Sequence, residues 1–199
     1  MQKNCILLWL LVLNAFTALA QTVLLDDFNR ANNTVVANSW NETETVANTS
    51  ITITSNQLRL GSATAGRDYV YRDVSALYNT VFNTNTGILT WSFNMRQSRT
   101  DPSGFDNSNY GVAFVLGCNS NNFLTGNGYA VVLGNSGTSD NLRLVRFVNG
   151  IDGNANMTNI IAPAVDYGND YLTVKVTYNP VGNNWSLYVG NNLGFLMIP

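Results

Sequence analysis

Apolar and polar side chains alternate through residues 88–97, Ile88-Leu89-Thr90-Trp91-Ser92-Phe93-Asn94-Met95-Arg96-Gln97. Successive side chains of a β-strand point to opposite faces of a sheet, so this alternation predicts a half-buried strand. The side chains assigned to the core are Leu89, Trp91, Phe93 and Met95, and those assigned to the solvent face are Thr90, Ser92, Asn94 and Arg96. A sheet with one buried face must pack against a second layer.

Period-two segments bounded by Asn, Gly and Ser recur along the chain, and no window of a dozen residues carries a convincing helical stripe. The strands expected besides 88–97 are 22–28, 40–46, 50–54, 57–60, 67–74, 110–117, 129–134, 141–148, 171–178 and 185–189. Ser55-Asn56 predicts a tight hairpin turn. The nearly continuous apolar runs at 110–117 and 129–134 predict central strands buried on both faces, and so does 141–148, where Leu142 and Leu144 alternate with Arg143, Val145 and Phe147. About ten or eleven strands at this spacing indicate an all-β fold, an antiparallel β-sandwich.

The first twenty residues have the features of a cleavable signal peptide. Lys3 supplies a positive start, residues 6–20 are largely apolar, and Ala18-Leu19-Ala20 offers a cleavage site before Gln21. No other segment approaches the roughly 18 apolar residues that a membrane-spanning helix needs. We therefore expect a protein that is secreted or held at the cell surface, with no membrane span in the mature chain.

The 199-residue length suits one sizeable domain, and we expect residues 21–199 to form a single β-sandwich. The chain ends on the apolar run Gly194-Phe195-Leu196-Met197-Ile198-Pro199, without a closing polar turn. We interpret this abrupt end as a domain that lacks about one or two final strands, which would leave a sheet edge unpaired. A piece of a longer protein would end in this way.

Composition excludes several classes of function. The chain has no histidine, which removes Ser-His-Asp and Cys-His catalysis and imidazole metal ligands. Charged residues are 11% of the chain and the net charge is −2, so no basic surface for nucleic acid is expected. Cys118 is the single cysteine after the signal peptide and is interpreted as a buried or half-buried strand residue. We do not expect an enzyme.

Five stretches resemble the LamG-like or concanavalin A-like jelly-roll domains of secreted Bacteroidetes proteins. They are Leu25-Asp26-Asp27-Phe28-Asn29-Arg30, residues 40–46, residues 66–73, residues 94–106 and residues 128–148. The resemblance covers nearly all of residues 21–199 and implies two stacked antiparallel sheets, one of them concave. Domains of this kind include lectins, carbohydrate-binding modules, adhesion modules and glycosidases, so the fold alone does not select a function.

Glycan binding requires a shallow groove with aromatic faces and planar polar groups. The candidates for such a groove on a concave sheet are Arg67, Tyr69, Tyr71, Asn94, Arg96, Tyr110 and Arg146. The alternative is that the tyrosines pack as ordinary strand residues and the arginines pair with Asp68, Asp73 or Asp101. The loop 97–109, which contains Asp101-Pro102-Ser103-Gly104, ranks second as a binding element.

A calcium ion is the one cofactor considered. Asp26 and Asp27, joined by a loop aspartate such as Asp106, could supply the carboxylate oxygens that Ca²⁺ prefers. The alternative is that these aspartates are turn residues at a strand end.

Three functions follow in order of preference. The first is a secreted, non-catalytic module that binds carbohydrate or another extracellular surface ligand. The second is a structural or spacer domain split from a larger secreted protein. The third is a glycoside hydrolase using Glu42 and Glu44, which would lie about 7 Å apart on one strand face. The Glu42-Thr43-Glu44 run lacks the third acid and the spacing found in the glycosidases it most resembles.

Overall fold

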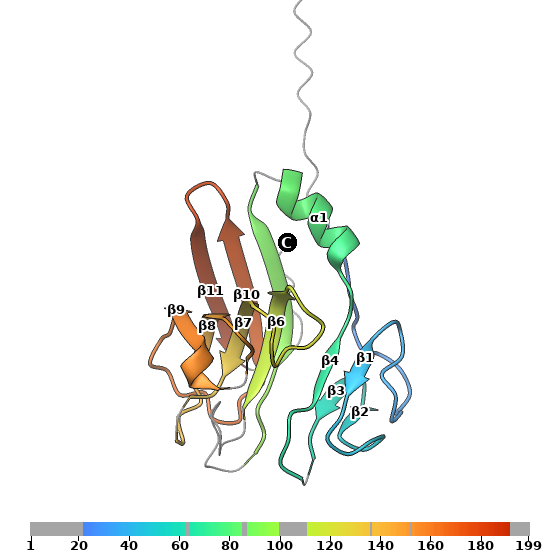
Figure 1. Ribbon diagram of the computed structural model, residues 1–199. Helices are drawn as coiled ribbons and strands as arrows, with labels where there is room; N and C mark the ends of the chain where they lie inside the picture. The colour runs from blue at the N-terminus through green and yellow to red at the C-terminus, as the bar shows by residue number, and fades with distance from the viewer. Residues whose placement is uncertain are drawn as a thin grey trace, which may run out of the picture. The chain divides into compact units, whose positions relative to one another are not determined.

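The computed structural model describes residues 22–62, 64–84, 87–99, 111–135, 137–151 and 153–191. Within these ranges the chain forms eleven strands, one α-helix and one short 3₁₀ helix, and the strands pair antiparallel in separate sheets (Figure 1). The all-β prediction is confirmed. The chain divides into two compact units between residues 72 and 73. That residues 21–199 act as a single domain stays a prediction.

The first unit contains four short strands in two-stranded pairs. They are β1 (Asn41–Thr43) with β4 (Tyr69–Tyr71), and β2 (Ile51–Thr54) with β3 (Gln57–Leu60). Ser55 and Asn56 connect β2 to β3 with φ angles of 53° and 59°. Two consecutive residues with positive φ make the turn that two-residue hairpins favour, so the predicted hairpin is confirmed.

The core of the first unit is small. Val36, Ile51 and Ile53 are fully buried, and the half-buried Phe28, Trp40, Leu58 and Val70 pack against them. The strand predicted at 22–28 was wrong, because no strand forms there. Instead, Asp26 and Asp27 accept hydrogen bonds from the backbone N–H groups of Phe28 and Asn29, at 2.8 and 3.0 Å. Such local side-chain bonds turn the backbone away from the geometry of a ladder.

The second unit contains two larger antiparallel sheets. One has the order β11-β10-β5, formed by β5 (Leu89–Met95), β10 (Leu172–Asn179) and β11 (Asn184–Asn191). The other has the order β6-β7-β8-β9, formed by β6 (Val112–Cys118), β7 (Gly128–Leu133), β8 (Leu142–Phe147) and β9 (Met157–Ile161). The sequence did not predict β9, whose three central residues are all exposed and so show no alternation. The 3₁₀ helix η1 (Asn154–Asn156) precedes it.

The two sheets of the second unit share one hydrophobic core. Its buried members are Met95, Leu172, Val174 and Val176 from the first sheet and Leu116, Val131, Leu133, Leu142 and Leu144 from the second. The rings of Phe93 and Phe114 join the layers, with centroids 3.7 Å apart and planes 6° apart. The inward assignment of Leu89, Trp91, Phe93 and Met95 is confirmed by their burial or packing against this core. The second unit is therefore a β-sandwich.

Strands β7 and β8 are buried on both faces, as predicted. The same prediction was wrong for β6, which is an edge strand of its sheet and is mostly half-buried. Ala130, Val132, Val145 and Phe147 point away from the first core and form a second cluster with Ile151. Burial on both faces explains the continuous apolar run of β7, whereas β8 also carries Arg143 and Arg146.

Arg143 of β8 is a buried cation, with 4% of its surface exposed. Its guanidinium donates to the carbonyl oxygen of Gly134 from Nε and Nη2, at 3.2 and 2.9 Å, and to the side-chain oxygens of Asn154 and Asn159. Burial lowers the pKa of Arg143. The oxygens of Gly134, Asn154 and Asn159 thus offset the cost of removing the guanidinium from water. Their hydrogen bonds connect these three segments to β8.

The helix α1 (Ser75–Thr84) was not predicted. Its sequence, Ser-Ala-Leu-Tyr-Asn-Thr-Val-Phe-Asn-Thr, is too short for a clear helical stripe. Tyr78 and Phe82, four residues apart, lie on the same face of α1 with ring centroids separated by 5.1 Å. Among the described residues, no helix is long and apolar enough to span a membrane.

Candidate ligand-binding site

The residues predicted to bind a ligand are distributed over both units. Arg67, Tyr69 and Tyr71 belong to the first unit, where Tyr69 and Tyr71 lie on β4 with ring centroids 6.3 Å apart. Asn94, Arg96 and Arg146 belong to the second unit. Tyr110 lies outside the described residues, as do Asp106 and most of the loop 97–109.

Within the second unit, Asn94 and Arg146 lie on different sheets. Asn94 is on the outer face of the three-stranded sheet, opposite Thr173. Arg96 follows β5, and its Nε donates to the carbonyl oxygen of Asn169 at 2.9 Å. Arg146 lies two residues beyond the core residue Leu144 and therefore on the inner face of β8. Asn94 and Arg146 thus do not line one concave surface.

The outer face that carries Asn94 is mainly polar. Ser92, Lys175 and Tyr188 lie in register across β5, β10 and β11. The Lys175 ammonium lies 4.4 Å from the centroid of the Tyr188 ring, and Tyr188 is 51% exposed. The Lys175 ammonium thus already covers one face of the Tyr188 ring.

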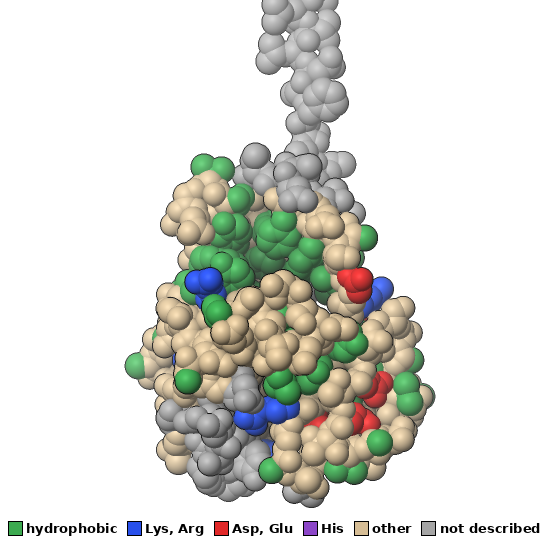
Figure 2. Space-filling model, in the orientation of Figure 1, with side chains coloured by type: hydrophobic (Ala, Val, Ile, Leu, Met, Phe, Trp, Pro, Cys, Tyr) green, Lys and Arg blue, Asp and Glu red, His purple; other side chains and the backbone are tan. Residues whose placement is uncertain are grey.

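A larger group of aromatic side chains lies at one end of the sandwich. We call it the aromatic cluster, and its members are Tyr78, Phe82, Trp91, Tyr129, Tyr178 and Trp185. Trp185 lies at its centre, with ring centroids 6.0 Å from Trp91, 5.0 Å from Tyr129 and 4.5 Å from Tyr178. Figure 2 shows apolar side chains gathered in a hollow between the β10–β11 hairpin and α1.

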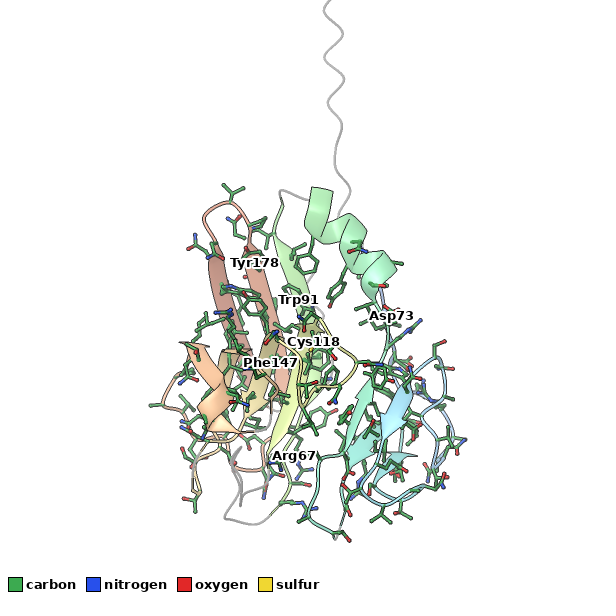
Figure 3. The ribbon with its side chains drawn as sticks, in the orientation of Figure 1. Arg67, Asp73, Trp91, Cys118, Phe147 and Tyr178 are labelled. Carbon is green, nitrogen blue, oxygen red and sulfur yellow. The ribbon has the colours of Figure 1, made fainter. Side chains whose placement is uncertain are left out.

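Strand register places these rings together. Tyr178 and Trp185 are paired across β10 and β11 near the hairpin turn, and Trp91 occupies the inner face of β5 (Figure 3). Tyr129, two residues before the core residue Val131, occupies the inner face of β7. Because Tyr129 is 38% exposed and Phe82 is 46% exposed, the aromatic cluster reaches solvent.

Two hydrogen bonds fix one wall of the aromatic cluster. The indole N–H of Trp91 donates to the Tyr78 hydroxyl at 2.8 Å, and that hydroxyl donates to the carbonyl oxygen of Leu116 at 2.7 Å. Burial raises the pKa of the Tyr78 phenol, against the opposing effect of the Trp91 hydrogen bond. The helix α1 is thereby joined to both sheets of the sandwich.

Other polar groups of the aromatic cluster are unengaged. Among the described residues, the Trp185 indole N–H and the hydroxyls of Tyr129 and Tyr178 have no hydrogen-bond partner. The guanidinium of Arg146, which is exposed and lies opposite Tyr129 in the β7–β8 ladder, likewise has no hydrogen-bond or ion-pair partner in that part of the chain. Aromatic surface and unpaired polar groups therefore occur side by side here.

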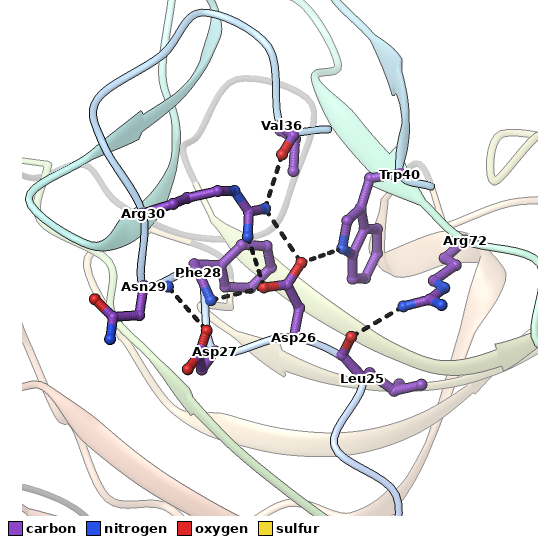
Figure 4. A network of polar contacts seen from close by, with 9 residues as sticks. All are labelled: Leu25, Asp26, Asp27, Phe28, Asn29, Arg30, Val36, Trp40 and Arg72. Atoms are coloured by element: carbon purple, nitrogen blue, oxygen red, sulfur yellow. Dashed lines mark hydrogen bonds and ion pairs between the residues drawn. The ribbon is translucent and has the colours of Figure 1, made fainter. Parts of the chain in front are cut away.

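Asp26, a candidate calcium ligand, is the centre of a polar network in the first unit (Figure 4). Its Oδ1 accepts from the Phe28 N–H and Arg30 Nη1, and its Oδ2 accepts from Arg30 Nη2 and Trp40 Nε1, all within 2.8–3.1 Å. Burial would raise the pKa of Asp26, but the hydrogen bonds and the Arg30 charge together lower it to about 2. A cation at Asp26 would have to displace Arg30, so this geometry favours a structural role.

The other acids of the first unit also bind backbone amides. Asp27 accepts from the Asn29 N–H, and Asp68 accepts from the Thr45 N–H at 2.6 Å. Glu42 accepts from the Val36 N–H at 2.5 Å, and Glu44 accepts from the N–H groups of Asn48 and Ile51. In the described ranges, no three acidic, cysteine or histidine side chains are grouped as a metal site would require.

Sequence reasoning placed Trp91 in the core and treated Tyr129, Tyr178 and Trp185 as ordinary strand residues. The signal that could have singled them out is the presence of Trp and Tyr, rather than Val and Leu, at inward-facing positions near the strand ends. Cys118, at the end of β6, is a free, half-buried thiol, in agreement with its prediction.

Comparison with protein-family models, curated proteins and solved structures found no match. Functional assignment therefore depends on the geometry of the chain itself.

Proposed function

We propose that this chain is a secreted, non-catalytic module that binds carbohydrate through the aromatic cluster of its second unit. One observation carries the proposal. Trp185 stacks with Trp91 and Tyr129 at the solvent-reaching end of the sandwich, while its indole N–H has no hydrogen-bond partner among the described residues.

Sugars suit this combination of groups. The C–H face of a pyranose ring packs on aromatic side chains, and its hydroxyls take up hydrogen bonds from nearby polar groups. Phe82 and Tyr129 offer accessible aromatic surface, and the hydroxyls of Tyr129 and Tyr178 offer donors and acceptors. The hydrogen bonds of Tyr78 hold one wall in place before a ligand arrives, which reduces the entropic cost of binding.

Secretion and the jelly-roll family belong to the same proposal. The signal-peptide features of residues 1–20 support export, and the packed antiparallel sheets of the second unit agree with a LamG-like or concanavalin A-like jelly roll. The engagement of Glu42 and Glu44 by backbone amides supports a non-catalytic role, because each carboxylate holds a loop of its own unit.

A second candidate is a structural or spacer domain. The observation in its favour is that the rings of the aromatic cluster contact one another, as they would if they only closed the end of the sandwich. This role would need no ligand, and the affinity of the protein for saccharides would then be negligible.

Isothermal titration calorimetry with neutral hexasaccharides of glucose, xylose and mannose, and with hexagalacturonate, tests the proposal. Trp185→Ala should weaken binding at least about fivefold, because removing an aromatic anchor costs more than about 1 kcal/mol. Tyr188→Ala, on the outer face, is the matched control and should bind as the wild type does. Absence of binding across the panel would favour the spacer role, and equal binding by both variants would exclude the aromatic cluster as the site.

A further inference from the structure

Arg146 gives the aromatic cluster a positive charge at its edge. It lies on the inner face of β8, opposite Tyr129 of β7 and Thr158 of β9, and all three side chains are exposed. Tyr129 in turn stacks with Trp185 at 5.0 Å. The guanidinium is therefore presented beside an aromatic surface and next to the Tyr129 hydroxyl, which has no hydrogen-bond partner among the described residues.

Acidic side chains are distributed differently. The described carboxylates of the second unit are Asp73, Asp140, Asp166 and Asp170. Asp140 and Asp166 lie at the start of β8, and Asp170 lies just before β10, whereas Arg146 and Tyr178 lie near the ends of those strands. Asp73 precedes α1, and its carboxylate accepts from the Ser75 N–H at 2.8 Å. Among the described residues none of these acids forms an ion pair with Arg146.

We propose that the ligand of the aromatic cluster is an acidic saccharide, whose uronate carboxylate is bound by Arg146 while its sugar ring packs against Tyr129 and Trp185. This inference rests on the proposed function. A guanidinium presents a planar fork of N–H donors that matches a carboxylate in two parallel hydrogen bonds, and an unpaired Arg is ready to form them. The exposed Thr158 hydroxyl is placed to bond the same carboxylate or a neighbouring sugar hydroxyl.

The charge on the sugar can be changed without changing its ring. Calorimetry would compare hexagalacturonate with its fully methyl-esterified form, which keeps the ring and the hydroxyls but removes the negative charge. The wild type should bind the acid at least about tenfold more tightly, as expected for a charge-assisted hydrogen-bonded pair. Raising the salt concentration should weaken binding of the acid and leave binding of the ester unchanged.

Variants of Arg146 locate the effect. Arg146→Gln should abolish the preference for the acid and leave the affinity for the ester unchanged, and Arg146→Lys should restore part of the preference. Lys175→Gln, which removes a cation from the outer face, is the control and should preserve the preference. Thermal melting of each variant establishes that it is folded.

The outcomes separate the two proposals. Equal binding of acid and ester, with no effect of Arg146→Gln, would overturn the acidic-saccharide inference and leave carbohydrate binding intact. Loss of the preference in Lys175→Gln but not in Arg146→Gln would also overturn it, by assigning the carboxylate to the outer face. Binding of neither saccharide form, nor of the neutral hexasaccharides, would overturn both.

Discussion

The indole rings of Trp91 and Trp185 stack with centroids 6.0 Å apart and planes 20° apart, although β10 lies between the strands that carry them. The contact requires both side chains to lean across the inner face of β10, above the fully buried Val176. The contact joins the buried core of the sandwich to the aromatic cluster, whose members Phe82 and Tyr129 are exposed.

Removing the Tyr78 hydroxyl should destabilise the second unit. Tyr78→Phe leaves the Trp91 N–H and the Leu116 carbonyl without their partner, which costs about 1–3 kcal/mol of unfolding free energy. Urea unfolding measures the loss. Tyr188→Phe is the control, because among the described residues the Tyr188 hydroxyl has no partner. Equal stability of the two variants would show that the hydrogen bonds of Tyr78 contribute nothing.

Alkaline pH should weaken the same contact. Burial raises the pKa of Tyr78 above its ordinary value of 10.0 in the folded state. Its contribution to stability is therefore complete below about pH 10 and is lost as the pH rises through the folded-state pKa. Urea midpoints at about pH 9 and pH 11 should differ more for the wild type than for Tyr78→Phe. Identical differences would contradict the burial of this phenol.

Acid should weaken the first unit through Asp26. Its pKa is lowered from 3.8 to about 2 in the folded state, so its contribution is complete above pH 3.8 and is lost as the pH falls through about 2. After allowance for solvent screening, we expect a loss of about 1–2 kcal/mol. Fluorescence of Trp40, whose indole donates to Asp26, reports the change.

Asp26→Asn should be less stable at neutral pH and should lack this acid dependence. The control is Asp27→Asn, since Asp27 is exposed and accepts one local hydrogen bond. An unchanged acid dependence in Asp26→Asn would assign the titration to another carboxylate.

The buried Arg143 should be essential for folding stability. Arg143→Ala removes the hydrogen-bond donor to the Gly134 carbonyl and to the side-chain oxygens of Asn154 and Asn159. We therefore expect the unfolding free energy to fall by at least about 2 kcal/mol. Arg146→Ala, on the same strand but exposed, should change the unfolding free energy by less than about 0.5 kcal/mol. Similar losses in the two variants would contradict the distinct roles of the two arginines.

Local patterns predicted the sheets better than they predicted the site. The alternation of residues 88–97 placed Trp91 and Phe93 inward correctly, because side-chain direction in a strand depends only on parity. The Ser55-Asn56 turn was also found from local sequence, because two polar residues separate two strand-like segments and asparagine tolerates a positive φ.

Features that depend on long-range pairing were not predicted. The approach of Tyr129 to Trp185 depends on how two sheets pack, and neither residue's neighbours in the sequence reveal it. The candidate residues were grouped on one concave sheet, whereas Asn94 and Arg146 lie on different sheets of the second unit and Asn94 faces outward. The helix α1 was missed because its ten residues are too few to show a clear helical stripe.

Tryptophan indole N–H signals in a ¹⁵N–¹H spectrum test the account most directly. The described residues contain three tryptophans, Trp40 in the first unit and Trp91 and Trp185 in the aromatic cluster, and Trp→Phe variants would assign their signals. Titration with hexagalacturonate should shift the Trp185 signal strongly, shift that of Trp91 less, and leave Trp40 unchanged. Shifts confined to Trp40, or none at saturating saccharide, would contradict a carbohydrate site in the aromatic cluster.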